Sequence, residues 1–151
     1  MGGLALAAMD PGVRFANDLG PKQVEVSGYP RVIHEGYALF EKKCATCHAP
    51  ARALNSEFVE LSEAECRKAL AAQPSLAADP RLWKIEPGIW KRYVKRMAAK
   101  PGSRMTTSEA MQIYAFLVYD GKARKVGDRA AEWRSQRTRW LQDFRRADPE
   151  R

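Results

Sequence analysis

Two cysteines and a histidine, grouped within five residues, restrict the fold of this chain more than any other feature. The group reads Cys44, Ala45, Thr46, Cys47 and His48, which is the pattern C-x-x-C-H. On a helical turn, thiols three positions apart lie on one side, and the next residue adds an imidazole beside them. We therefore expect a fold that presents two thiols and one imidazole to the same bound group.

This spacing fits the covalent attachment of haem c. The thiols of Cys44 and Cys47 can each add to one vinyl group of the same porphyrin, and C-x-x-C-H is the signature of this attachment. The imidazole of His48 is then placed to bind the iron as its first axial ligand. We expect one haem, held by these three residues.

Three alternatives to haem remain open at the motif. A thioredoxin-like redox pair would require a β-strand before Cys44, and no strand pattern precedes it. A zinc site would need Cys66 or His34 to complete it, and neither stands at finger-like spacing. The third alternative is a chance match.

The composition is that of one folded domain with a basic surface. The chain has 151 residues, of which 45% are hydrophobic and 29% charged, close to the average for soluble globular domains. Its formal charge of +8 favours an acidic redox partner, anionic lipid or nucleic acid, unless it only keeps the protein in solution. No run approaches about 20 apolar residues, so we expect no transmembrane helix.

Hydrophobic residues at helical spacing predict an all-α fold. A first helix over 31–43 leads into the motif, with Ile33, Tyr37 and Phe40 on one side. Ser62 and Glu65 form a capping box that begins a second helix, which ends near Gln73 before a proline.

Two further helices complete the predicted core. A third helix begins near Pro87 and ends before residues 101–102, a Pro-Gly pair. Its apolar stripe consists of Trp90, Tyr93, Val94 and Met97. A fourth helix begins at the capping box of Thr106 and Glu109, and we expect Asp120 and Gly121 to end it.

Residues 31–119 resemble the mono-haem cytochrome c family of bacteria. Gly36, Phe40 and the two motif cysteines keep the spacing of that family's first helix and attachment site. The resemblance implies a cytochrome c-like domain of about four helices around one haem, in which the first helix crosses the last core helix at Gly36. The expected partners of this crossing are Tyr114, Phe116 or Leu117. Residues 100–120 also resemble the closing segment of such domains.

The resemblance further implies a methionine as the second axial ligand. Family members usually place it after the third helix and a few residues before the last core helix, which favours Met97 over Met105. Met111 lies inside the last core helix and is the weakest candidate. Met97 could instead only complete the apolar stripe, and it is followed by Ala98 where the family often has proline.

An iron without a methionine ligand is the alternative. His34 could supply a second imidazole, although it precedes the motif on the same helix and would reach the opposite haem face with difficulty. An open iron would bind small ligands or peroxide instead of transferring electrons. The third cysteine, Cys66, is expected to be a small buried side chain or, alternatively, a reactive thiol.

The chain extends beyond a minimal cytochrome domain at both ends. We expect the haem domain over 31–121, an extended arm over 1–30, and a basic linker with an amphipathic helix over 122–151. Residues 1–9, MGGLALAAM, contain an Ala-x-Ala pattern without a basic segment, and they resemble the remnant of a secretory signal.

The last helix, over about 128–146, mixes aromatic residues with arginines, as interface hot spots do. Its aligned apolar residues are Trp133, Trp140, Leu141 and Phe144. Three hypotheses remain for it: docking on a larger redox complex, binding to a membrane surface, or packing onto its own domain.

Together these observations predict an electron-transfer protein and not an enzyme. One covalent haem c would be held by Cys44 and Cys47, with His48 and Met97 on the iron. Its partners would be acidic redox proteins or a membrane-associated electron-transfer complex, with no nucleic acid, because haem attachment occurs outside the nucleic-acid compartment. The resemblance places the protein in the periplasm or on the periplasmic face of a membrane complex.

Overall fold

The computed structural model describes residues 14–78 and 87–147, and its regular structure in these ranges is helical, with no strand. The elements are η1 (Ala16–Asp18), α1 (Arg31–Cys44), α2 (Ala51–Leu54), α3 (Glu63–Ala72), η2 (Pro74–Ala78), α4 (Ile89–Ala98), α5 (Thr107–Lys125), η4 (Gly127–Arg129) and α6 (Ala130–Ala147). The expected all-α fold is confirmed. Residues 1–9, interpreted as a signal remnant, lie outside the described ranges.

Both capping boxes begin helices where the sequence predicts them. The Ser62 hydroxyl accepts a hydrogen bond from the Glu65 amide at 3.2 Å, and the Glu65 carboxylate accepts one from the Ser62 amide at 2.6 Å. Thr106 and Glu109 make the same reciprocal pair at the start of α5, at 2.8 and 3.2 Å. These bonds lower the pKa of both carboxyls and satisfy amides that a helix start leaves unpaired.

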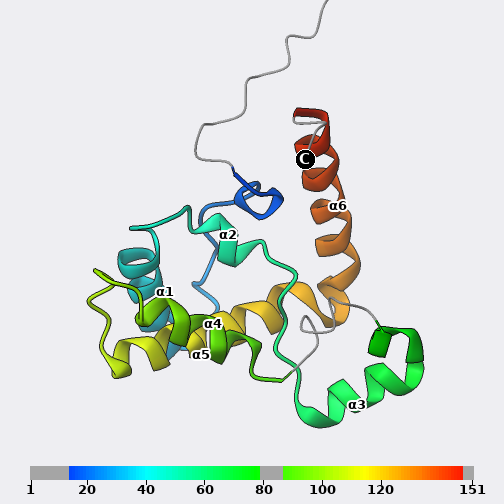
Figure 1. Ribbon diagram of the computed structural model, residues 1–151, viewed down its shortest axis with the longest axis horizontal. Coiled ribbons are helices and arrows are strands. Elements are labelled where there is room, and N and C mark those ends of the chain that lie inside the picture. The colour runs from blue at the N-terminus through cyan, green and yellow to red at the C-terminus, as the bar shows by residue number, and fades with distance from the viewer. Residues whose placement is uncertain (1–13, 79–86, 148–151) are drawn as a thin grey trace, which may run out of the picture.

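The centre of the core is the crossing of α1 and α5 (Figure 1). Gly36 lies at this crossing, where a Cβ atom would overlap the Gln112 carbonyl oxygen and lie 3.0 Å from the Phe116 Cβ. Phe40 and Phe116 are fully buried with ring centroids 5.4 Å apart, and the Tyr37 ring lies 5.0 Å from that of Phe116. The crossing implied by the resemblance is therefore present.

α4 also packs against α5, and it ends in a tight turn. Its buried residues are Ile89, Trp90 and Val94. α4 begins after Gly88, whose positive φ of 81° suits glycine. Beyond its end, Gly102 has a φ of 82° and the Ser103 amide donates to the Lys100 carbonyl at 3.1 Å, so the Pro-Gly pair forms the expected stop.

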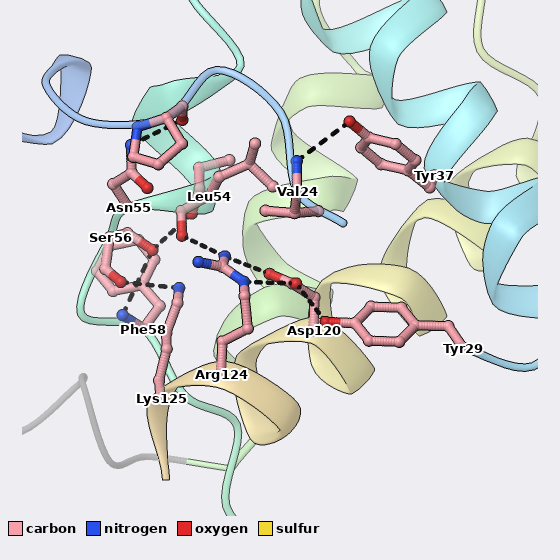
Figure 2. A network of polar contacts seen from close by, with 12 residues as sticks. Val24, Tyr29, Tyr37, Leu54, Asn55, Ser56, Phe58, Asp120, Arg124 and Lys125 are labelled. Carbon is pink, nitrogen blue, oxygen red and sulfur yellow. Dashed lines mark hydrogen bonds and ion pairs between the residues drawn. The ribbon is translucent and has the colours of Figure 1, made fainter. Parts of the chain in front are cut away.

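The prediction that Asp120 and Gly121 end the fourth helix is wrong, because α5 continues to Lys125. The Asp120 carboxylate is buried and accepts hydrogen bonds from the Tyr29 hydroxyl at 3.0 Å and from Arg124 at 2.7 and 2.5 Å (Figure 2). Gly121 is buried as well. Both residues are therefore buried inside the helix and do not end it. Most of the basic linker expected from residue 122 onward is the last turn of α5.

The described part of the N-terminal arm, residues 14–30, folds back onto α1 and the segment that follows the motif. The Asn55 side-chain amide donates to the carbonyls of Leu19 and Pro21 at 2.6 and 3.0 Å. Further along, the Val24 amide donates to the Tyr37 hydroxyl at 3.3 Å (Figure 2). The arm is thus held by polar contacts to α1 and to the segment that follows the motif.

α6 also packs onto the rest of the chain, through the end of α5 and through η1. Trp133 and Phe144 are each 8% exposed, and a Cβ on Gly20 would lie 2.8 Å from the Trp140 ring. The hypothesis of aromatic anchors for an outside partner is therefore wrong for Trp133 and Phe144, which this chain buries itself. The exposed side of α6 carries mainly charged residues, among them Arg134, Arg139, Arg145 and Arg146.

Replacing Gly36 with alanine should destabilise the protein by about 1–3 kcal/mol, because the new methyl group must separate α1 from α5. Urea unfolding measures this cost. Gly28→Ala is the matched control, since a Cβ there meets nothing within 4 Å, and it should change stability by less than about 1 kcal/mol. Equal effects of the two substitutions would contradict the close crossing.

Candidate functional site

A largely apolar cavity lies between α1, α4 and α5, beside the C-x-x-C-H motif. Its space, including the part open to solvent, is about 1020 Å³. The apolar wall consists of Phe40, Phe58, Trp90, Tyr93, Val94, Ile113 and Leu117. All three motif residues predicted to hold haem line this cavity.

The motif presents its thiols from the end of α1. Cys44 ends the helix and is partly buried, whereas Cys47 is exposed, and neither forms a disulfide. Burial, with a smaller contribution from Cys47, raises the pKa of Cys44 to about 11. The Thr46 hydroxyl donates to the Lys43 carbonyl at 3.0 Å and closes the turn. The two thiols are therefore free for bond formation at the cavity edge.

One hydrogen bond defines which ring nitrogen of His48 carries the proton. Its Nδ1 lies 3.0 Å from the Ala49 carbonyl oxygen. Because a carbonyl can only accept, Nδ1 must donate, which leaves Nε2 as the nitrogen able to bind a metal. A histidine with one ring nitrogen tied to a carbonyl is the usual arrangement of a metal ligand in proteins.

Two of the three candidate methionines line the cavity. Met97 reaches it from α4, and Met105 reaches it from the residue before the cap of α5. Met105 also packs against the hydrophobic core. Met111 is 55% exposed on α5 and is not part of the lining.

The described residues offer no support for a zinc site. Cys66 lies on α3 and His34 lies near the start of α1, and neither lines the cavity with the motif. Across residues 14–78 and 87–147, no group of three or more His, Cys, Asp and Glu side chains is arranged to hold a metal ion. The donors that do converge are two thiols, one imidazole and two thioethers around an apolar space, and this set fits haem c.

A family model described as "Cytochrome C oxidase, cbb3-type, subunit III" matches residues 31–117, from the start of α1 into α5. The chain belongs to this family. The resemblance to c-type cytochromes is thereby confirmed, and with it a role in haem-based electron transfer in general, with haem c as the cofactor of the family. Comparisons with curated proteins and with solved structures gave no match. Among the residues that the structure describes, no helix is long and apolar enough to cross a membrane.

Three basic side chains, all buried or partly buried, donate hydrogen bonds to successive backbone carbonyls just after the motif. Arg124 donates to the Leu54 carbonyl at 2.9 Å, Arg137 to the Asn55 carbonyl at 3.0 Å, and Lys125 to the Ser56 carbonyl at 2.8 Å. Figure 2 shows Arg124 and Lys125 reaching this segment from the end of α5. Cations at the end of a short helix such as α2 satisfy carbonyls that the helix leaves unpaired.

Sequence reasoning missed these cations, and it also missed Asn17 and Arg52, which line the cavity. Basic residues near a helix end were a usable signal for the carbonyl contacts. The contacts of Asn17 and Arg52 depend on the folding back of the arm, for which the sequence carries no local signal.

Lys125 connects the cavity wall to α6. Its ammonium lies 5.8 Å from the ring centre of Trp90, which lines the cavity, and 5.5 Å from that of Trp133. Lys125 is buried, and burial, followed by the charge of Arg124, lowers its pKa to about 7.

The charge on Lys125 should make stability depend on pH. The unfolded chain keeps this proton up to the ordinary pKa of 10.5, whereas the folded chain releases it near pH 7. Between these values the unfolded state binds more protons, so stability rises with pH, by up to about 1.4 kcal/mol per pH unit. Below pH 7 both states carry the proton and this contribution is flat.

Denaturant unfolding at about pH 6 and about pH 9 tests this dependence. From the lower to the higher pH, the free energy of unfolding of the wild type should increase relative to that of Lys125→Met. Lys122→Met, which removes an exposed ammonium of the same helix, should follow the wild type at both pH values. A constant difference between wild type and Lys125→Met would contradict the lowered pKa.

Proposed function

We propose that this chain carries electrons through a single haem c bound covalently by Cys44 and Cys47, with His48 and Met97 as the axial ligands. The observation that carries the proposal is the convergence of these four side chains on one apolar cavity. The bound haem would supply an iron that cycles between ferrous and ferric. The protein would be an electron carrier or a subunit of a redox complex, and not an enzyme.

The surroundings support Met97 over Met105 as the second ligand. Met105 is packed against the hydrophobic core, and its chain segment is tethered by Lys43, which donates to the Arg104 carbonyl at 2.8 Å. Met97 lines the cavity without being packed against that core, so its thioether is available for a ligand role. A His/Met pair raises the reduction potential of a c-type haem.

The side chains around the cavity would favour fast electron exchange in three ways. The aromatic and aliphatic wall would exclude water from the haem, His48 is held by the Ala49 carbonyl, and two thioether bonds from Cys44 and Cys47 would fix the position of the haem. Ligands that stay in place in both oxidation states keep the reorganisation small. None of these roles requires a proton to move during electron transfer.

The charge distribution supports an acidic partner. Lys43 and Lys100 line the cavity, and every charged residue between positions 87 and 108 is basic. Exposed members of this set are Lys91, Arg92, Lys95, Arg96, Lys100 and Arg104. Such a surface attracts a negatively charged protein and orients it, an effect that weakens with salt.

The family match supports a membrane-associated electron-transfer complex as the partner. The proposed location is the periplasm or the periplasmic face of such a complex. A second candidate function, an open-site haem protein that binds small ligands or peroxide, would apply if no methionine binds the iron.

Intact mass together with a pyridine haemochrome spectrum tests the haem itself. We expect the full chain, produced with haem-attachment machinery, to be heavier by the mass of one haem and to keep its colour after acid-acetone extraction. Cys44→Ala with Cys47→Ala should abolish this covalent haem, whereas Cys66→Ala should retain it. A wild-type mass without haem would contradict the proposal.

The ligand assignment is tested by comparing Met97→Ala with Met105→Ala. The oxidised wild type should show the weak far-red band of a thioether bound to iron, and Met97→Ala should lose it, acquire a lower reduction potential and bind carbon monoxide when reduced. Met105→Ala should keep the band. Loss of the band only in Met105→Ala would transfer the role to Met105, and carbon monoxide binding by the native reduced protein would favour the open site.

A further inference from the structure

The N-terminal arm supplies a buried carboxylate to the segment that follows the motif. The Asp18 side chain has no exposed surface, and its two oxygens accept hydrogen bonds from the Arg52 guanidinium at 2.7 and 2.9 Å. The amides of Arg14 and Phe15 also donate to Asp18, both at 2.9 Å. Burial alone would raise the pKa of Asp18, but the bonds from Arg52 and from the two amides hold it below its usual value.

Arg52 connects this carboxylate to the ligand side of the cavity. Its side chain lines the cavity, and its backbone amide donates to the Ala49 carbonyl at 3.1 Å. The same carbonyl accepts the hydrogen bond from His48 Nδ1 at 3.0 Å. A continuous series of contacts therefore leads from Asp18 through Arg52 and Ala49 to the imidazole.

We propose that Asp18 is a positioning residue for His48, acting through Arg52 and the Ala49 carbonyl. The proposal rests on the proposed function, in which His48 is the first iron ligand. A planar guanidinium held by two parallel bonds has little freedom to rotate, so it fixes the first turn of α2. The Ala49 carbonyl at the start of that turn then fixes the plane of the imidazole ring, and with it the direction of the Nε2 lone pair.

Asp18 lies outside the part of the chain that the family model covers. The family match begins at residue 31, so residues 14–20 precede the matched domain. Asn55 and Trp140 contact the residues directly after Asp18, at Leu19 and Gly20 respectively. These contacts fix the arm next to Asp18, so it can hold the Asp18 carboxylate against Arg52.

Nuclear magnetic resonance of the haem-loaded full chain tests the proposal. The readouts are the exchange rate of the His48 Nδ1 proton with solvent and the pattern of haem methyl shifts in the oxidised protein, which reports the orientation of the imidazole plane. Asp18→Asn should speed the exchange by about tenfold and alter the methyl pattern, because the loss of one hydrogen bond to a charged group favours opening of the Ala49 contact by about this factor. Arg52→Lys keeps the charge but loses the paired bonds, so it should change both readouts in the same direction.

Gln23→Ala is the matched control. It removes another contact of the arm, the bond of 3.4 Å from Gln23 to Glu41 on α1, without touching Arg52. Both readouts should stay at their wild-type values in this variant. Thermal unfolding of all variants, recorded in parallel, separates a change at His48 from a general loss of stability.

Two results would overturn the positioning role. One is a wild-type exchange rate and methyl pattern in Asp18→Asn and Arg52→Lys, or in Arg52→Lys alone if the other variant does not fold. The second is an equal change in Gln23→Ala, which would assign the effect to arm docking in general. The proposed function fails separately, if the wild-type mass lacks covalent haem, and this is measured before any variant is compared.

Discussion

The close contact between the backbones of α1 and α5 at Gly36 determines where the rest of the site can lie. No side chain separates the two helices at this point, so the Phe40 and Phe116 rings pack directly beside the crossing. α1 then delivers Cys44 at its end, while α5 contributes Ile113 to the cavity wall. Because buried helices are close-packed, a wider crossing would displace the thiols relative to the apolar wall of the cavity.

A second set of contacts attaches the two extensions to this core. The carbonyls of Leu54, Asn55 and Ser56 accept hydrogen bonds from cations of α5 and α6, while the Asn55 side chain holds the arm. The segment after the motif therefore forms hydrogen bonds with both the N-terminal arm and the C-terminal part of the chain. The described parts of the extensions, residues 14–30 and 122–147, belong to the fold, and a boundary drawn at residue 121 would divide a buried network.

Local signals in the sequence predicted most of the fold. The capping boxes at Ser62 and Thr106 and the stripe that includes Trp90 depend on neighbours within one or two helical turns, and all of them are present. The end of α5 was mispredicted because Asp120 and Gly121 are helix-stopping residues only where they face solvent. Here Asp120 pairs with Tyr29, which lies 91 residues away in the chain and gives no local signal.

The site divides in the same way. The proposed donors Cys44, Cys47 and His48 could be named from the sequence because the spacing of the C-x-x-C-H motif is local, and the structure places Met97 and Met105 at the same cavity. The contacts that hold these donors in place could not be predicted from the sequence. Asp18 reaches Arg52, and Lys125 reaches Ser56, only after the chain has folded back on itself.

The carbonyl contacts after the motif also have a consequence for the order in which the chain becomes structured. The Asn55 carbonyl is bound by a side chain 82 positions later, and those of Leu54 and Ser56 by side chains 70 and 69 positions later. Contacts across such sequence distances close slowly. In a nascent polypeptide the segment after the two thiols is therefore not yet rigidified by its carboxyl-terminal cations, and the proposed attachment of a porphyrin would fall in this interval.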